Sequence, residues 1–119
     1  NFDQVVGVAD RRKFVSALIV PNYAVLEAWA KAEGLQHESR EALCNDPRVV
    51  NHLAERIETL QQDLAAYEKI KRFVLLPKPF TIESGELTNT LKIKRRVVYE
   101  RYADLIERMY ADVPSGRPA

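Results

Sequence analysis

Two short apolar runs near the start of the chain, separated by polar residues, have the pattern of a β-hairpin. Valine and isoleucine dominate residues 4–8 and 14–20, and both amino acids favour strands. The polar residues 10–13 between the runs predict the turn of the hairpin. Because the second run is apolar on both faces, we expect it to be the central strand of a sheet that is covered on both sides.

Helical patterns follow the hairpin. Pro21 should end the second strand, and Asn22 should then cap a helix that extends to Glu33 and stops at Gly34. The side chains expected on the buried face of this helix are Val25, Leu26 and Trp29.

A short helical turn over residues 39–44 precedes the longest predicted helix, which is capped by Asp46 and has Pro47 at its first position. Apolar residues follow at alternating spacings of three and four. They are Val50, Leu53, Ile57, Leu60, Leu64 and Tyr67. This series covers fewer than the ~3–4 heptads that indicate a coiled coil, so the pattern favours a helix packed on a sheet.

A third apolar run, residues 73–76, predicts a strand that is closed by Pro77 and Pro79. A hairpin, helices and a returning strand imply a crossover connection and a small mixed sheet. The last helix is predicted over residues 93–111, with an apolar stripe on one side and charged side chains on the other. The stripe contains Val98, Tyr102, Leu105, Ile106 and Met109, and Arg101, Asp104, Glu107 and Arg108 face outward. The predicted class is therefore α+β, a small mixed β-sheet flanked by helices with a lysine-bearing loop before the C-terminal helix.

Composition narrows the function classes. The 119 residues are 46% apolar and 29% charged, which is typical of one globular domain. Eighteen basic and seventeen acidic residues leave a net charge of +1, which argues against nucleic acid as the partner. Cys44 is the only cysteine, so we expect no disulfide framework and no cysteine metal site, and a reducing, cytoplasmic setting. No run approaches the ~20 apolar residues that span a bilayer.

The chemistry-bearing residues concentrate in residues 80–110, FTIESGELTNTLKIKRRVVYERYADLIERMY. A polar loop leads there into Lys92, Lys94, Arg95 and Arg96, a local positive charge suited to an anion. A nucleic-acid or anionic-membrane patch is disfavoured because the domain is near neutral and the cluster lacks interleaved aromatic residues.

Other candidate sites are weaker. His37 and His52 have no cysteine or second histidine nearby in the sequence, so no metal site is predicted. Cys44 has no general base at helical spacing, and we expect it to be a small buried apolar residue.

The basic run resembles the lysine-bearing C-terminal motif of adenylate-forming enzymes in the long-chain fatty acid–CoA ligase branch, which reads G-x-L-T-x-T-L-K, then a basic pair and a helix. The residues that match in register are Gly85, Leu87, Thr88, Thr90, Leu91, Lys92, Lys94 and Arg95. VVGVADRRKFVSALIVPN at residues 5–22 and FVLLPKPFT at residues 73–81 resemble two further blocks of the same small domain. The resemblance therefore extends over nearly the whole chain.

The resemblance implies that residues 1–112 are the C-terminal domain of a longer enzyme and that residues 113–119 are a flexible tail. In that family, a large N-terminal adenylation domain binds ATP, Mg²⁺ and the fatty acid, and the small domain closes over it in two orientations. Acyl-AMP forms in the first, and coenzyme A takes the acyl group in the second. By resemblance, Lys92 is the catalytic residue, and Lys94 and Arg95 are candidate contacts to phosphate or coenzyme A. The active-site loop that precedes Lys92 consists, by the same resemblance, of Gly85, Leu87, Thr88, Thr90 and Leu91. The domain alone is expected to be inactive.

The chain departs from the family motif at two positions, and two alternative functions stay open. Asn89 stands where the family usually has proline, so the loop is expected to be less rigid. Leu91 stands where many relatives acting on smaller acids have glycine, which favours the long-chain branch. The alternatives are another adenylate-forming enzyme, such as a fatty acyl-AMP ligase that delivers to a carrier protein, and a noncatalytic interaction module. Peripheral membrane association of the full enzyme is a further open point.

Overall fold

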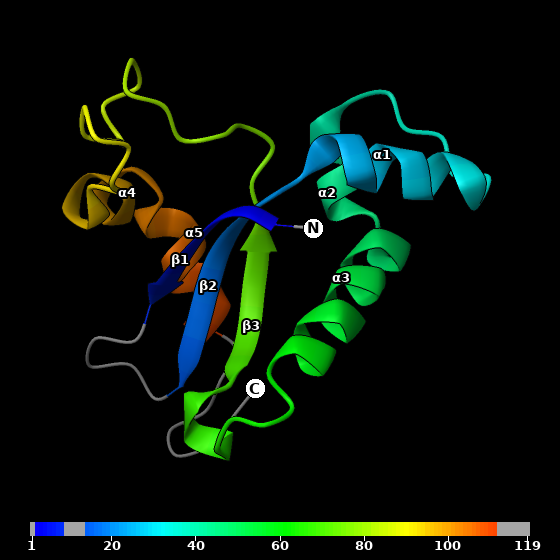
Figure 1. Ribbon diagram of the computed structural model, residues 1–119, viewed down its shortest axis with the longest axis horizontal. Coiled ribbons are helices and arrows are strands. Elements are labelled where there is room, and N and C mark those ends of the chain that lie inside the picture. Colours follow the sequence, from blue (N-terminus) through cyan, green and yellow to red (C-terminus); the bar gives the residue numbers. More distant parts are fainter. Residues whose placement is uncertain (1, 9–13, 112–119) are drawn as a thin grey trace.

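The computed structural model describes residues 2–8 and 14–111, which form strands and helices around a three-stranded sheet (Figure 1). The elements in chain order are β1 (Phe2–Val8), β2 (Val15–Pro21), α1 (Tyr23–Ala32), α2 (Arg40–Asn45), α3 (Pro47–Leu60), the short 3₁₀ turn η1 (Ala66–Glu68), β3 (Ile70–Leu75), α4 (Arg95–Arg101) and α5 (Ala103–Ala111). The predicted turn at residues 10–13 and the predicted tail at 113–119 lie outside the described residues. No helix within the described ranges has the length and apolarity needed to cross a membrane.

The sheet has the order β1-β2-β3, and its pairing is mixed. β1 is antiparallel to β2, with Val6 opposite Leu18, and β2 is parallel to β3, with Leu18 opposite Val74. Every residue of β2 after Val15 is buried, because helices lie on both faces of the sheet. The mixed sheet and the central position of the second strand are both confirmed.

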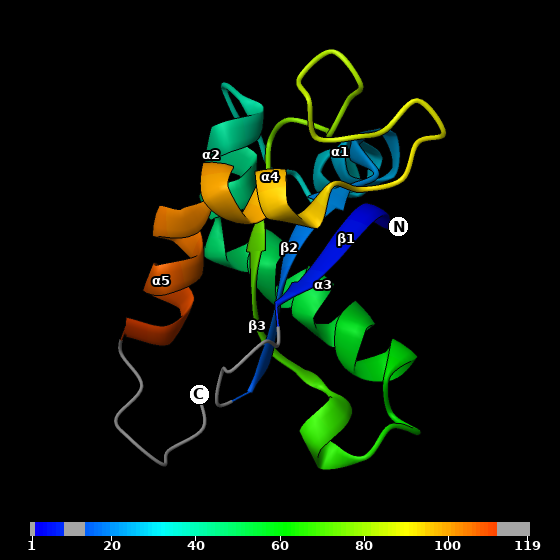
Figure 2. The same ribbon diagram turned by 90° about the vertical axis from the view of Figure 1, so that its left-hand side faces the viewer.

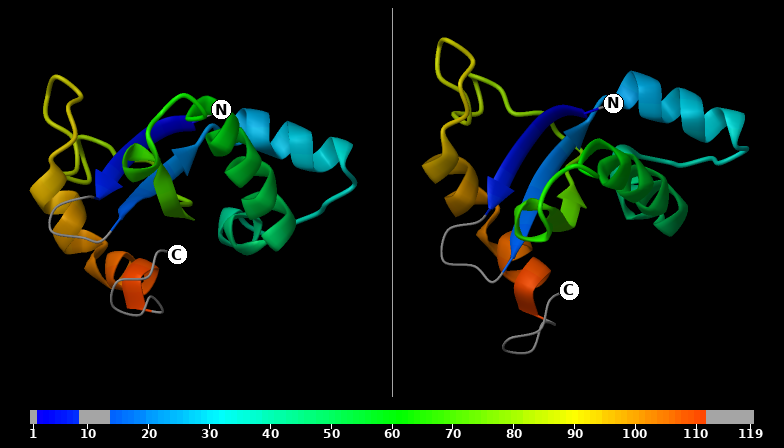
Figure 3. Two further views of the ribbon diagram at one scale, coloured as in Figure 1. Left: turned by 90° about the horizontal axis from the view of Figure 1, so that it is seen from below. Right: turned by 60° about the horizontal axis from the view of Figure 1, so that its bottom comes forward.

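Helices α4 and α5 lie on one face of the sheet, and α3 lies on the other (Figures 1 and 2). α1 and α2 extend from one end of the sheet, as the views from below show (Figure 3). One core joins these layers. Its most buried large side chains are Leu18, Ile19, Leu76, Val6, Val20, Val49 and Val98.

The ends of α1 follow the local sequence signals. The side chain of Asn22 accepts a hydrogen bond from the Val25 amide at 3.3 Å. At the other end Gly34 adopts a left-handed φ of +77°, and the Leu35 amide reaches back to the Ala30 carbonyl at 2.9 Å. This is the Schellman arrangement, which glycine allows at little steric cost. Both predicted ends of this helix are confirmed.

The predicted buried face of α1 is partly wrong. Val25 is 47% exposed and Trp29 is half-buried, whereas Tyr23, Leu26 and Ala30 are buried. The face of α1 that packs on the core is therefore the one that begins at Tyr23, the first residue of the helix. The reason is tertiary, because the Tyr23 hydroxyl donates to the Leu76 carbonyl at 2.7 Å and turns that face inward.

The predicted apolar seam of α3 is correct only in its first half. Leu53 and Ile57 are buried, but the helix ends at Leu60, which is 66% exposed, and Leu64 and Tyr67 lie beyond it at 45% and 81% exposure. The helix ends there because the next residue, Gln61, pairs its side chain with the first residue of β3.

Gln61 binds the backbone of Ile70 with both ends of its amide. Its Oε1 accepts the Ile70 N–H at 3.0 Å, and its Nε2 donates to the Ile70 carbonyl at 3.2 Å. This pairing explains why β3 begins at Ile70, three residues before the predicted strand.

The predicted single last helix is two helices. α4 begins at Arg95 rather than at residue 93, and Tyr102, with φ −107° and ψ 23°, separates it from α5. The break falls where Arg101 is hydrogen-bonded to the preceding loop, at the Ser84 carbonyl. The predicted faces are otherwise confirmed, because Val98, Ile106 and Met109 are buried and the four charged residues predicted to face outward are exposed.

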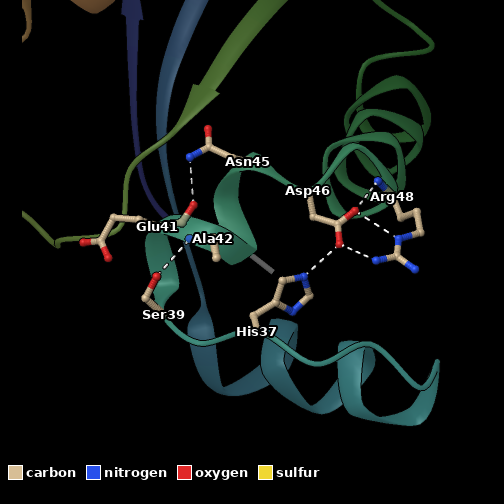
Figure 4. Close-up of polar contacts among 7 residues, drawn as sticks. All are labelled: His37, Ser39, Glu41, Ala42, Asn45, Asp46 and Arg48. Atoms are coloured by element: carbon tan, nitrogen blue, oxygen red, sulfur yellow. Dashed lines mark hydrogen bonds and ion pairs between the residues drawn. The ribbon is translucent and has the colours of Figure 1, made fainter.

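Two further sequence expectations concern Cys44 and the histidines. Cys44 is buried, as predicted, with its Sγ 2.7 Å from the Tyr23 hydroxyl, and burial raises the pKa of both groups. His52 stacks on Trp29 with ring centroids 3.9 Å apart. His37 Nε2 lies 2.8 Å from the Asp46 carboxylate (Figure 4).

Asp46 joins α2 to α3 and is the centre of a polar cluster (Figure 4). Its Oδ1 accepts the Arg48 amide at 2.8 Å, which caps α3. The Arg48 guanidinium also binds this carboxylate, with Nη2 2.8 Å from Oδ2. Arg48 first, and His37 after it, hold the pKa of the Asp46 carboxyl well below its usual range.

The two halves of the predicted seam should respond differently to mutation. Leu53→Ala removes a side chain that is 2% exposed, and we expect it to lower the free energy of unfolding by about 2–5 kcal/mol. Leu60→Ala is the matched control on the same helix, and its effect should stay within about 0.5 kcal/mol. Urea denaturation followed by circular dichroism measures both. Equal losses would mean that Leu60 is packed in solution.

The Asp46 cluster should make stability fall in acid. The pKa of Asp46 is lowered on folding, so in acid the unfolded chain binds more protons than the folded chain. The contribution of Asp46 to the free energy of unfolding is therefore complete above about pH 4 and is lost as the pH falls below it. Asp46→Asn should therefore flatten the acid side of the stability–pH curve measured by urea denaturation. Asp63→Asn, at an exposed carboxyl, should leave the shape unchanged, and identical curves for wild type and Asp46→Asn would contradict the assignment.

Candidate active-site loop

The loop between β3 and α4 begins with an anchor on the edge strand β1. The Phe80 N–H donates to Gln4 Oε1 at 2.7 Å, and Gln4 Nε2 donates to the Phe80 carbonyl at 3.1 Å. The side-chain amide thus takes the place of a neighbouring strand for this one residue. Phe80 itself is buried, so its ring packs into the core beneath the loop.

A compact turn follows this anchor. The Thr81 and Ser84 side chains each accept the other's backbone N–H, at 2.9 and 3.2 Å. Gly85 then adopts φ +84°. A side chain is rarely found in that left-handed region, which accounts for the glycine of the motif.

Residues 86–94 form a small hairpin, which we call the lysine hairpin. Leu87 and Ile93 form an isolated antiparallel bridge, and the Lys94 N–H donates to the Glu86 carbonyl at 2.8 Å. At the tip the Thr88 N–H donates to the Lys92 carbonyl at 2.8 Å. The Lys92 N–H donates in return to Thr88 Oγ1 at 3.0 Å.

The tip is therefore held by its own threonines. Thr88 Oγ1 also lies 3.1 Å from Thr90 Oγ1, and the Leu91 N–H donates to the Thr88 carbonyl at 2.8 Å. Leu91 has φ +64°, and among the described residues it alone, apart from glycine, has a positive φ. The loop is closed by these bonds even though Asn89 replaces the proline that would stiffen it.

The basic side chains of the motif differ in what they contact. Lys92 and Lys94 are exposed, and in the part of the chain that the structure describes neither ammonium forms an ion pair or hydrogen bond. The Arg95 guanidinium donates to the Gly7 carbonyl at 3.0 Å, a carbonyl that the Tyr99 hydroxyl also binds at 2.7 Å. Lys92 and Lys94 are thus available to an anion, whereas Arg95 also ties α4 to β1.

Sequence reasoning missed the buried carboxylate beneath the hairpin. The Glu86 side chain is 4% exposed, and its carboxylate lies 3.4 Å from Arg101 and accepts the Ser84 hydroxyl at 2.7 Å. Burial, followed by the charge of this carboxylate, raises the pKa of the Tyr102 phenol. No periodicity relates a loop residue to a helix fifteen positions later, so the sequence carries no signal for this cluster.

The residues of the predicted loop thus come together in one structure. Gly85 forms the turn before the lysine hairpin, Leu87 forms its stem, and Thr88 and Leu91 shape its tip around Lys92. In the described residues no group of three or more histidine, cysteine, aspartate or glutamate side chains could hold a metal ion.

Residues 2–114 match the family of AMP-binding enzyme C-terminal domains. The chain belongs to this family. The chain is similar over most of its length to a plant protein and to a mycobacterial protein. It is 36% identical over 104 residues to the peroxisomal long chain acyl-CoA synthetase 7 of Arabidopsis thaliana, covering 86% of this chain and 15% of the relative. It is 34% identical over 113 residues to the long-chain-fatty-acid–CoA ligase FadD15 of Mycobacterium tuberculosis, covering 90% and 18%.

A solved structure has the same fold. The A-PCP didomain of carboxylic acid reductase from Segniliparus rugosus, in complex with AMP, superposes with a TM-score of 0.71 at 24% sequence identity, over 92% of this chain and 14% of that one. The α+β class and the resemblance to adenylate-forming enzymes are both confirmed. The chain spans less than a fifth of the length of each of these relatives.

The backbone at Leu91 generates a prediction for this domain. A left-handed conformation costs a non-glycine residue about 1–2 kcal/mol. Replacing Leu91 with glycine removes this cost, but part of the gain in stability is offset because glycine loses more backbone entropy on folding. Leu91→Gly should raise the free energy of unfolding by up to about 1 kcal/mol. Leu91→Val should lower it by about 1 kcal/mol, since a β-branched residue tolerates this region least.

Thr90→Gly is the control for this test, because Thr90 is exposed in the same tip and has no positive φ. Urea denaturation should show it to be destabilising. A Leu91→Gly loss as large as that of Thr90→Gly would mean that the tip does not hold this conformation in solution.

Proposed function

We propose that this domain is the C-terminal lid of a long-chain fatty acid–CoA ligase. The enzyme would join a fatty acid to ATP, giving acyl-AMP and pyrophosphate, and then transfer the acyl group to coenzyme A. The observation that carries the proposal is the lysine hairpin, which fixes the backbone of Lys92 and leaves its ammonium exposed. The names of the Arabidopsis and mycobacterial relatives support the same reaction.

Lys92 is the proposed catalytic residue for the first half-reaction. A fatty acid carboxylate oxygen attacks the α-phosphorus of ATP, and the bond to the β-phosphate oxygen breaks as pyrophosphate leaves. Two anions must approach each other, and negative charge develops on the α-phosphate oxygens. A compact ammonium on a long stem can lie beside both anions and stabilise that charge.

The second half-reaction does not need the positive charge of Lys92 beside the reacting groups. The thiol of coenzyme A loses its proton to solvent as its sulfur attacks the acyl carbon, the bond to the adenylate oxygen breaks, and AMP leaves. We propose that the lid rotates between the steps and withdraws Lys92. The hairpin suits such a movement because it is built from local bonds and would travel with the domain as one unit.

Lys94 and Arg95 are proposed as auxiliary contacts to phosphate or coenzyme A. Lys94 is the simpler candidate, because its ammonium is exposed. Arg95 donates through Nη1 to the Gly7 carbonyl, which leaves its other guanidinium N–H groups for an anion.

The remaining parts of the site would come from the N-terminal adenylation domain. The four glycines of this chain never cluster into a phosphate-binding loop, so ATP would be held mainly elsewhere. The described residues offer no metal site, so Mg²⁺ would also be held mainly by the N-terminal domain. The reductase didomain of the same fold was solved with AMP, which is compatible with adenylate chemistry in this chain. A cytoplasmic location and peripheral membrane association of the whole enzyme stay predictions.

The decisive variant is Lys92→Ala in the full-length enzyme. Pyrophosphate exchange with fatty acid and ATP should fall by about 10²–10³-fold, because the developing charge on the α-phosphate loses its counter-ion. Thioester formation from synthetic acyl-adenylate and coenzyme A should change little. Lys94→Ala should lower the exchange rate less than Lys92→Ala does.

Lys31→Ala is the matched control, since Lys31 is an exposed lysine on α1. Equal loss in both half-reactions, or unchanged exchange in Lys92→Ala, would contradict the role of Lys92. Wild-type enzyme that makes acyl-AMP but no coenzyme A thioester would instead favour a fatty acyl-AMP ligase.

A further inference from the structure

A buried carboxylate lies directly beneath the stem of the lysine hairpin. Glu86 is 3% exposed as a residue, and its side chain faces away from solvent. Ser84 donates to its Oε1 at 2.7 Å, and Arg101 lies 3.4 Å from its Oε2. A buried carboxylate is unfavourable unless it is paired in this way.

Glu86 also belongs to the backbone of the hairpin. Its carbonyl accepts the Lys94 N–H at 2.8 Å, and the next residue, Leu87, forms the bridge to Ile93. The same residue therefore bonds α4–α5 through its side chain and the lysine strand of the hairpin through its backbone. The orientation of the stem relative to α4 depends on both contacts.

The partners of Glu86 lie at the break between α4 and α5. Arg101 is the last residue of α4, and its Nη1 also donates to the Ser84 carbonyl at 2.5 Å. Tyr102 is the residue that separates the two helices. The other end of α4 is bonded to β1 through Arg95 and Tyr99. The helix is thus attached at its start to the sheet and at its end to the hairpin that carries Lys92.

We propose that Glu86 is a positioning residue for the adenylation half-reaction, acting through its contacts with Ser84 and Arg101 to aim the lysine hairpin. This proposal rests on the proposed function of Lys92. Glu86 is buried and does not meet the substrate; it sets the direction in which the stem presents the ammonium. A displacement of about 1 Å at a reacting group can lower a rate by up to 10²-fold.

The test uses the full-length enzyme and the two half-reactions. Glu86→Ala should lower kcat for pyrophosphate exchange by about 10–100-fold, while KM for ATP and thioester formation from synthetic acyl-adenylate stay within about twofold. Glu86→Gln keeps the shape and one acceptor oxygen for Ser84, and should retain more exchange activity than Glu86→Ala. Glu100→Ala is the control, because Glu100 is a glutamate on α4 in an exposed pair with Arg96.

A double-mutant cycle separates positioning from general damage. If Glu86 acts through Lys92, then Glu86→Ala should cause almost no further loss of exchange in a Lys92→Ala enzyme. Fully additive losses, or equal loss in both half-reactions, would overturn the proposal for Glu86. Unchanged exchange in Lys92→Ala alone would overturn the proposed function instead. Arg101→Ala gives an independent check, since it should reproduce the Glu86→Ala phenotype without altering the hairpin sequence.

Discussion

The free edge of β1 is the constraint on which the site depends. β1 pairs with β2 on one side only, and an edge strand offers unpaired backbone groups to other partners. Here Gly7 offers its carbonyl to Arg95 and Tyr99, and the Gln4 side chain holds the start of the loop. A loop and a helix that lie more than seventy residues later in the sequence are thereby attached to the first strand of the domain.

This attachment fixes the backbone of the loop and of α4 and leaves the Lys92 side chain free to move. The loop is held at Phe80, the helix α4 is held near its start, and the hairpin between them is closed by its own threonines. The side chain of Lys92 then extends from a fixed backbone into solvent. A long flexible side chain on a rigid base can follow a reacting group over a short distance, while its point of origin moves only with the whole domain.

The sequence predicted the parts whose causes are local. Asn22 and Gly34 mark the ends of a helix by their own side chain and backbone preferences, and an unbroken apolar run marked the central strand. The wrong predictions have causes far away in the sequence. α3 ends early because Gln61 pairs with Ile70, and the last helix breaks where Arg101 meets Glu86. The motif around Lys92 could be recognised, but its buried support could not, because nothing in its spacing distinguishes Glu86 from a surface glutamate.

The two glutamine anchors share a property that the charged contacts lack. Gln4 and Gln61 each pair an uncharged amide with a backbone N–H and carbonyl. An amide side chain does not ionise in the physiological range, and bonds between neutral groups are little affected by dissolved salt. The attachment of the loop to the sheet, and of α3 to β3, should therefore persist across changes of acidity and ionic strength that would weaken contacts between opposite charges.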